Sequence, residues 1–315
     1  MPKTIDAVVC GSCVADLLIG PVRLDVPWGE GTLTVVEPIE PATGGIVCNA
    51  GIALARLGMR VAALGCVGND HWGPMIRRRL ADEGIDTHAL VTHPTAATTT
   101  AAVLIDSAGQ RSFAFCPGAT EQLSPALFVD NLDRFAQSRM ALVGYYSLLP
   151  NLEHDLPDVL AAIGERGCRT ALDSAGSGGH MQPLDRILPH LDVYVPSHAE
   201  AAHQTGESDP RAILDVYRRC GATGLVGVKL GAEGALLSPA AGEYVPIDPV
   251  RPPGPVVDTT GAGDCFYAGL LVGLLKGMPV EQAGRLAAAC GALCITGKGA
   301  TTAVSDYAAV ARLAP

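Results

Sequence analysis

The stretch DTTGAGDCFYAGLL, residues 258–271, decides how the rest of the chain is interpreted. It places three small residues, Gly261, Ala262 and Gly263, directly before a carboxylate, Asp264, and an apolar run that reads as a helix. Glycine allows backbone conformations that point successive N–H groups into one hollow, and the positive end of the following helix adds to the attraction for anions. We therefore expect these three residues to form an anion hole that suits phosphate.

Asp264 would repel an anion if its only role were to line this hollow. A carboxylate beside a bound phosphate can instead accept the proton of a hydroxyl that attacks the phosphorus. The positive end of the helix should keep Asp264 ionised at neutral pH. The alternative interpretation is that Asp264 is an ordinary residue at a helix start, where Asp is favoured in any case.

The remaining chain alternates short β-branched runs with helical stretches rich in Ala and Leu. Strands separated by helices indicate βαβ units, and hence an α/β fold with a parallel sheet covered on both faces. The predicted strands are 6–11, 60–68, 140–146, 169–176, 191–197, 224–231 and 234–240, and the predicted helices are 48–58, 73–84, 155–167, 264–276 and 280–294.

Two segments break this rhythm, residues 17–43 and residues 89–118. The first holds four prolines and alternates as strands do in TLTVVEPIEP (32–41), and the second contains two alternating runs joined at SAGQ (107–110). We expect the two segments to pair into one small sheet that stands off the main body and serves as a lid or a dimer contact. No linker or internal repeat is evident, so residues 1–315 are expected to form a single domain.

Composition limits the partners. A formal charge of −10 argues against a nucleic-acid surface, which would need a basic face. The sequence contains no run of 18 or more apolar residues, so it predicts no membrane span. The start MPKTIDAVVCGSC lacks the features of a signal peptide, and we therefore expect a cytoplasmic protein.

The ten cysteines are scattered along the chain, and most are expected to be small buried residues. Cys10 and Cys13 have redox spacing, but they follow a predicted strand without the helix start that would lower a thiol pKa. Cys290 and Cys294 lie one helical turn apart without further ligands that would complete a zinc site.

Several polar or glycine-rich turns follow predicted strands, where ligands bind in open parallel sheets. They are Asp16, the pair Gly44 and Gly45 before the helix that carries Asn49, Asp173, Glu200, and the segment 229–231. Tyr145 and Tyr146 either line the same pocket or simply pack at a strand end.

The whole pattern resembles the ribokinase-like (PfkB) carbohydrate kinases. Residues 258–271 resemble the carboxyl-terminal signature of that family, and GGIVCNAGIALARLGMRVAALGCVGNDHWG (44–73) resembles its amino-terminal signature. GSCVAD (11–16), LDSAG (172–176) and VKLGAEG (228–234) follow the family's order and spacing, so the resemblance covers nearly the whole chain.

The resemblance implies a ribokinase-like three-layer sandwich, with a central mostly parallel sheet and a small β lid. It implies a kinase that phosphorylates a hydroxyl of a sugar or nucleoside with ATP and Mg²⁺, and we expect a homodimer formed through the lid. By position, Asp264 is the catalytic base, next to the anion hole. The sugar hydroxyls are assigned to Asp16, Gly44, Gly45 and Asn49. The alternatives are a turn cap for Asp16 and a structural residue of the helix start for Asn49.

The resemblance also places Lys229 and Gly231 along the nucleotide. The family usually has Asn-x-x-Glu near the phosphates and the metal, whereas this chain has SHAE at 197–200. Glu200 is therefore expected to act on Mg²⁺ through water, while Ser197 replaces the usual amide at one ATP contact. Asp258 and Thr260, with the carbonyls around 296–299, resemble the monovalent-cation loop of the family and imply activation by K⁺.

Three alternatives are weighed against this interpretation. A dinucleotide-binding dehydrogenase would need G-x-G-x-x-G after the first strand, and a P-loop kinase would need GxxxxGK[ST]; the sequence has neither. A non-catalytic sugar- or nucleotide-binding protein would have no need of both Asp264 and the GAG turn.

Few cations occur near the lid, which favours unphosphorylated substrates, although Arg111 keeps an acidic sugar open. Substrate choice is expected to depend on lid residues, namely Gln110, Arg111, Phe113 and Phe115.

Overall fold

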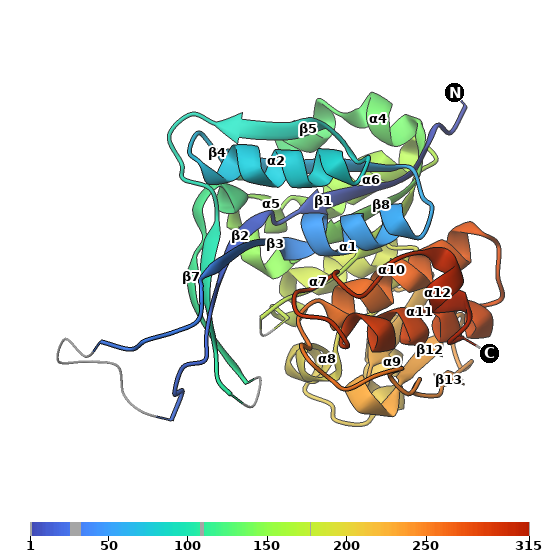
Figure 1. The fold of residues 1–315 in the computed structure, drawn as a ribbon. Coiled ribbons are helices and arrows are strands. Elements are labelled where there is room, and N and C mark those ends of the chain that lie inside the picture. Colours follow the sequence, from blue (N-terminus) through green and yellow to red (C-terminus); the bar gives the residue numbers. More distant parts are fainter. Residues whose placement is uncertain (1, 26–32, 108–109, 177, 315) are drawn as a thin grey trace.

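A sheet of nine strands forms the centre of the protein in the computed structural model, which describes residues 2–25, 33–107, 110–176 and 178–314 (Figure 1). Its strand order is β13-β12-β11-β10-β9-β8-β1-β4-β5, with the pairs β11–β12 and β12–β13 antiparallel and the remaining pairs parallel. The strands are β1 (Ile5–Gly11), β4 (Val61–Gly68), β5 (Asp86–His93), β8 (Ser138–Gly144), β9 (Arg169–Leu172), β10 (Val193–Tyr194), β11 (Leu225–Lys229), β12 (Ala235–Ser238) and β13 (Val245–Ile247).

Helices cover both faces of this sheet (Figure 1). Alternate residues of β1 show the two sides, since Ala7 and Val9 belong to one buried cluster while Val8 and Cys10 belong to another. The predicted α/β sandwich with a mostly parallel sheet is therefore confirmed. The helices are α1 (Gly45–Arg56), α2 (Trp72–Asp82), α3 (Pro125–Val129), α4 (Leu132–Ala136), α5 (Pro150–Glu153), α6 (Leu156–Glu165), α7 (Met181–Ile187), α8 (His198–Thr205), α9 (Pro210–Arg219), α10 (Ala262–Leu275), α11 (Val280–Cys294) and α12 (Tyr307–Ala311).

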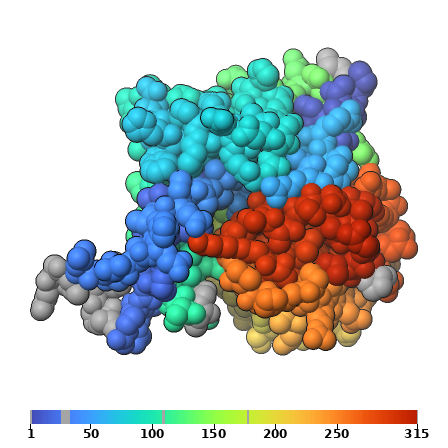
Figure 2. All heavy atoms as spheres, viewed as in Figure 1, coloured from blue at the N-terminus to red at the C-terminus, as the bar shows by residue number. Residues whose placement is uncertain are grey.

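A second sheet of four strands stands off the main body, as predicted. Its order is β3-β2-β6-β7, formed by β2 (Val14–Ile19), β3 (Glu40–Gly44), β6 (Thr100–Ile105) and β7 (Arg111–Cys116). We call this sheet the lid. Figure 2 shows that part of the segment between β2 and β3, in blue, projects away from the rest of the molecule.

Two details of the predicted lid segments are wrong. Residues 33–39 form no strand, because Pro38 interrupts them and their apolar side chains find no sheet to cover: Leu33 is 90% exposed and Val35 86%. Residues 89–93 belong to β5, which pairs with β4 in the main sheet rather than in the lid. Of the predicted lid segments, residues 26–32 and 108–109 lie outside the described part of the chain.

The cysteines Cys10 and Cys13 are free thiols that pack in the core, and burial raises the pKa of Cys10. Within the described ranges, no helix combines the length and the apolar character needed to cross a membrane.

Candidate active site

The helix α10 begins at the GAG turn. Gly261 is its N-terminal cap, with a φ of +72°, and a Cβ there would lie 2.4 Å from the Cβ of Ala300. Both the left-handed conformation and the close approach therefore require glycine. The N–H of Ala262 donates to the carbonyl of Thr259 (3.3 Å), so Gly261 and Gly263 supply the amides of the turn best suited to an anion.

Asp264 lies in the first turn of α10 and is only 5% exposed. Asn49 Nδ2 in α1 donates to its Oδ2 at 2.8 Å, across 215 positions of sequence. The hydroxyl of Tyr145 donates to the same carboxylate, 3.0 Å from Oδ1 and 2.9 Å from Oδ2. The carboxylate is thus oriented by two side chains from distant elements, one of which was predicted to bind sugar.

Burial raises the pKa of Asp264, while the hydrogen bonds from Asn49 and Tyr145 and the charge of Lys229 oppose the rise. The sequence predicts that the positive end of the helix keeps Asp264 ionised, and burial, which acts against ionisation, is an effect that this expectation left out. Desolvation outweighs the groups that favour the charged form, and a raised pKa makes the carboxylate a stronger proton acceptor than an exposed aspartate.

Tyr267, one turn further along α10, fixes the helix against the main sheet. Its hydroxyl donates to the carbonyls of Leu172 (2.6 Å) and Val193 (3.1 Å), at β9 and β10. These bonds hold the first turn of α10 beyond the carboxyl ends of the parallel strands, which is where ligands bind in such sheets.

Lys229 at the end of β11 pairs with Asp173, which follows β9. Lys229 Nζ lies 3.1 Å from Asp173 Oδ1, and both side chains are buried. Burial raises the pKa of Asp173 to about 7, against the attraction of Lys229. Burial lowers the pKa of Lys229, but the charges of Asp173, Glu200 and Asp264 together hold that pKa above its usual value.

The residues predicted to hold the sugar meet where the lid joins α1. A Cβ on Gly44 would lie 2.1 Å from Asp16 Oδ2, and a Cβ on Gly45, whose φ is +78°, would lie 2.4 Å from the Ser12 carbonyl oxygen. Burial raises the pKa of Asp16 to about 6. Asn49 Oδ1 is buried without a hydrogen-bond partner in the described residues, and it therefore favours a ligand that donates a hydrogen bond there.

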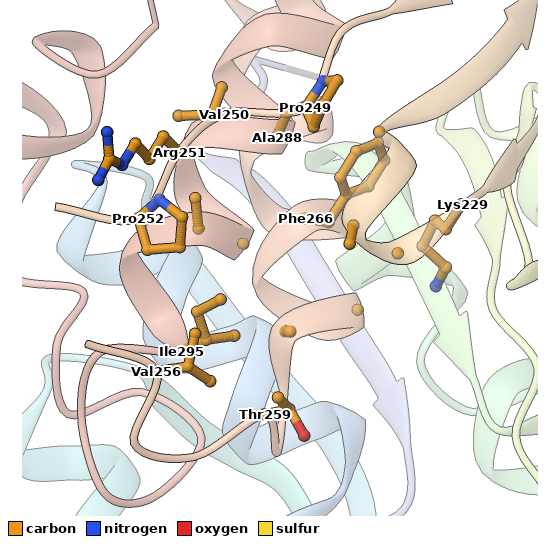
Figure 3. A pocket seen from close by; sticks show the side chains of 17 residues that line it. Lys229, Pro249, Val250, Arg251, Pro252, Val256, Thr259, Phe266, Ala288 and Ile295 are labelled. Atoms are coloured by element: carbon orange, nitrogen blue, oxygen red, sulfur yellow. The ribbon is translucent and has the colours of Figure 1, made fainter. Parts of the chain in front are cut away.

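A cavity of about 690 Å³ opens beside the GAG turn (Figure 3). Lys229 and Gly231, both predicted to lie along a nucleotide, line it together with Ala262 and Gly263. Apolar side chains from α10, α11 and the segment after β13 form much of its wall, including Phe266, Ile295, Val250 and Val256. Such a slot suits a flat heteroaromatic ring, with the polar groups at one end.

Ser197 and Glu200 form a capping box at the start of α8. Glu200 Oε2 accepts hydrogen bonds from the Ser197 N–H and hydroxyl, each at 2.7 Å, and Ser197 Oγ accepts from the Glu200 N–H at 3.4 Å. Both side chains, predicted to meet ATP and Mg²⁺, therefore have a structural role as well. In the described residues, no cluster of three or more His, Cys, Asp or Glu side chains could hold a metal ion.

Asp258 and Thr260, predicted to hold K⁺, lie just before the GAG turn and contact the lid. Arg111 of β7 forms an ion pair with Asp258 and donates to the hydroxyl of Thr260. Asp258 also accepts from the N–H groups of Thr260 (2.7 Å) and Gly299 (2.8 Å).

Sequence reasoning did not assign Asp173 as the partner of Lys229, and it left the role of Tyr145 open. A strand end followed by an acidic residue was a usable signal for Asp173. No sequence signal marks Tyr145, a non-glycine residue at a φ of +61°, and this left-handed conformation accompanies its contact with Asp264.

A family model described as pfkB family carbohydrate kinase matches residues 4–306. The chain is 29% identical over 322 residues to a ribokinase of Arabidopsis thaliana, with 97% of this chain and 80% of that protein covered. It is 33% identical over 315 residues to a fructokinase of Klebsiella pneumoniae, covering 94% and 95% of the two proteins.

Among solved structures, the fold is similar to that of the Arabidopsis thaliana ribokinase complexed with ribose and ATP. The TM-score is 0.86 at 25% identity, and 99% of each chain is covered.

Proposed function

The chain belongs to the pfkB family of carbohydrate kinases, and from this premise we propose that it transfers the γ-phosphoryl group of ATP to a hydroxyl of a sugar or nucleoside. The observation that carries the proposal is the position of Asp264. It is buried and oriented by Asn49 and Tyr145, and it directly follows Ala262 and Gly263 of the GAG turn, which line the same cavity as Lys229.

The proposal gives each site residue a separate role in the reaction. Asp16 and Asn49 hold the acceptor through its hydroxyl groups, because their oxygens accept hydrogen bonds. The attacking hydroxyl gives its proton to Asp264 as its oxygen bonds to the γ-phosphorus, and the bond from that phosphorus to the bridging oxygen of ADP breaks. The amides of Gly261 and Gly263 stabilise the negative charge of the transferring group.

ATP fits the cavity, whose apolar wall suits a purine and whose polar end holds Lys229. The solved ribokinase of Arabidopsis thaliana carries ATP, which supports the same nucleotide here. Mg²⁺ neutralises phosphate charge in such reactions and usually keeps several waters. We assign Glu200 to one of those waters through Oε1, which is supported by the engagement of only its other oxygen, Oε2, in the cap of α8.

The charges of the site support an uncharged acceptor. Lys229 is paired with Asp173, and Arg111, the residue that left an acidic sugar open, is paired with Asp258. Neither cation is therefore available to a phosphate or carboxylate on the sugar without losing its partner. The register of the lid strands places Phe113 and Phe115 on the same face as Asp16, where they can contact the apolar side of a sugar ring.

The test is ADP release across a panel of pentoses, ketoses and nucleosides, with Asp264→Asn as the inactive variant. Loss of the base should lower kcat by about 10²–10⁴-fold while the sugar still binds. Asp130→Asn, at an exposed position at the end of α3 that does not line the cavity, is the matched control and should keep full activity. An unchanged rate in Asp264→Asn would refute the assignment of the base. Binding without turnover on every substrate would instead favour a non-catalytic binding protein.

A further inference from the structure

One side chain of the lid strand β7 reaches the turn before α10. Arg111 Nη2 pairs with Asp258 Oδ1, and Arg111 Nη1 donates to Thr260 Oγ1, a residue 149 positions away. The side chains of Arg111 and Asp258 are only 10% and 5% exposed. The contact is therefore a buried, charge-assisted interaction between two parts of the molecule that are distant in sequence.

The register of the lid directs Arg111 towards the site. Arg111 pairs with Ile105, Phe113 with Val103 and Phe115 with Ala101, and Ala101 in turn pairs with Asp16. Because directly opposed residues lie on the same face of a sheet, Arg111 shares a face with Asp16. The guanidinium thus extends from the substrate-facing side of the lid.

Asp258 connects this guanidinium to the anion-hole turn. Its carboxylate accepts from the N–H of Thr260, which directly precedes Gly261, and from the N–H of Gly299 in a second loop. The position of the GAG turn consequently depends on a carboxylate whose only cationic partner in the described part of the chain is Arg111.

These residues do not fit a monovalent cation. Both side chains expected to bind K⁺ already accept from Arg111, Asp258 through Oδ1 and Thr260 through Oγ1, and Asp258 Oδ2 accepts from the Gly299 N–H. Two nearby carbonyls are also engaged, since Thr260 O accepts from the Cys294 thiol and Ala300 O from the thiols of Cys265 and Cys294. A cation placed here would face a guanidinium, so it would be repelled rather than bound.

We propose that Arg111 is the built-in cation of this loop, so that the lid itself supplies the positive charge that steadies the turn before the anion hole. Arg111 is a positioning residue in this proposal, which rests on the proposed kinase function. Two consequences follow. Turnover does not depend on K⁺, and docking of the lid and ordering of the GAG turn occur together.

Removal of the guanidinium would leave Asp258 buried with only backbone donors, and the vacated space would then suit a small cation. Arg111→Ala should therefore become dependent on K⁺, which can take the place of the lost charge. Arg111→Lys keeps a charge but lacks the planar fork that contacts Asp258 and Thr260 together, so it should show an intermediate effect.

The experiment compares turnover with and without K⁺ at constant ionic strength, with tetramethylammonium as the replacement ion. The wild-type protein should change by less than about twofold, since only screening differs. Arg111→Ala should lose about tenfold or more of its turnover without K⁺, because a buried charge is left unpaired, and should recover with K⁺. Arg23→Ala is the matched control, because Arg23 forms an exposed pair with Asp25 in the lid segment, and it should behave as wild type.

A second readout does not depend on catalysis. In Arg111→Ala, amide hydrogen exchange in β6 and β7 should be faster than in wild type, and K⁺ should raise the Tm of this variant alone. If the wild type has no kinase activity, these measurements still test the lid contact. Should Arg111→Ala fail to fold, Arg111→Met, which preserves side-chain bulk, replaces it. Activation of the wild type by K⁺ of about tenfold, or exchange and Tm values of the variant equal to those of wild type, would overturn the proposal.

Discussion

Asp173 and Asp264 are buried carboxylates and Asp16 is partly buried, and burial raises the pKa of each one. A carboxyl group whose pKa is higher in the folded than in the unfolded protein destabilises the fold when it is ionised. That destabilisation grows as the pH rises above the usual range of an aspartate. The protein therefore maintains these charges at some cost in stability, and a substrate that donates hydrogen bonds offsets part of it.

Asp16→Asn tests this at one position. Asparagine has no charge to desolvate, and the raised pKa of about 6 corresponds to roughly 2–3 kcal/mol at pH 8. The variant should be more stable than wild type by up to about that amount. Because wild-type Asp16 takes up its proton as the pH falls through about 6, the difference should shrink towards pH 4. Urea unfolding at several pH values measures it.

The same variant should bind the sugar less well. Weaker binding would distinguish a carboxylate that contacts the substrate from one that only lowers the stability of the fold. Asp248→Asn is the control, since an exposed site should change the free energy of unfolding by less than about 0.5 kcal/mol. If Asp16→Asn were less stable than wild type at pH 8, the argument from burial would be wrong.

The chemistry of single residues could be predicted from the sequence only where a motif fixed the local backbone. Asp264 and the GAG turn are contiguous, so their joint arrangement follows from a few dihedral angles and a helix start. The contact of Asp264 with Tyr145 depends on how β8 ends in space, and local sequence does not encode it. The capping role of Glu200 follows from its spacing to Ser197 and could have been recognised.

At the scale of elements, the position of Asp264 depends on how α10 packs on α11. The two helices approach through small residues: a Cβ on Gly269 would lie 2.8 Å from Ala287 Cα, and one on Gly273 would lie 2.6 Å from Ala283 Cβ. No side chain could be added at either glycine without separating the helices. The start of α10, which carries the GAG turn and Asp264, would move with them.

Gly273→Ala should therefore destabilise the protein by about 1–3 kcal/mol through overpacking and should also lower turnover. Gly164→Ala, in α6, is the matched substitution: it is exposed and a Cβ there meets nothing within 4 Å. This control should be neutral or stabilising by up to about 1 kcal/mol, as alanine is the better helix former. Denaturant unfolding of both variants decides the point. Equal changes in the free energy of unfolding for Gly273→Ala and Gly164→Ala would show that α10 and α11 tolerate separation.

The elements were predicted best where hydrophobic periodicity and length agreed, as in α10, α11 and the buried strand β1. Strand β13 was missed, since three residues carry too little pattern to identify. Residues 33–39 alternate like a strand but form none, because alternation indicates a strand only where a sheet is available to pair with. β5 was assigned to the wrong sheet because sequence order does not reveal which neighbour a strand will pair with.

For the whole molecule, the lid and the segment between β2 and β3 present apolar side chains that the described residues leave exposed. Leu33, Val35 and Phe113 are 90%, 86% and 58% exposed. Apolar groups gathered on one projecting part of a protein commonly mark a contact with another molecule. The prediction that two copies associate through the lid has this physical support.

Val35→Ser combined with Phe113→Ser should convert a dimer into a monomer, because both apolar contacts are lost. Analytical ultracentrifugation of wild type and variant measures the mass directly. Val129→Ser in α3 removes an apolar side chain that is 53% exposed on the body, and it should leave the dimer intact. A wild-type protein that sediments as a monomer at every concentration would exclude association through the lid.

The hydrogen bond between Asn49 and Asp264 also has a consequence for biosynthesis. During translation the amino-terminal half emerges from the ribosome before α10 is synthesised. Asn49 is therefore present before Asp264, the carboxylate to which it donates a hydrogen bond. Contacts this remote along a polypeptide form late and slowly. A nascent chain interrupted before α10 therefore contains the residues proposed to hold the sugar but lacks the proposed base, so under the proposed function catalysis requires the last segments to be synthesised.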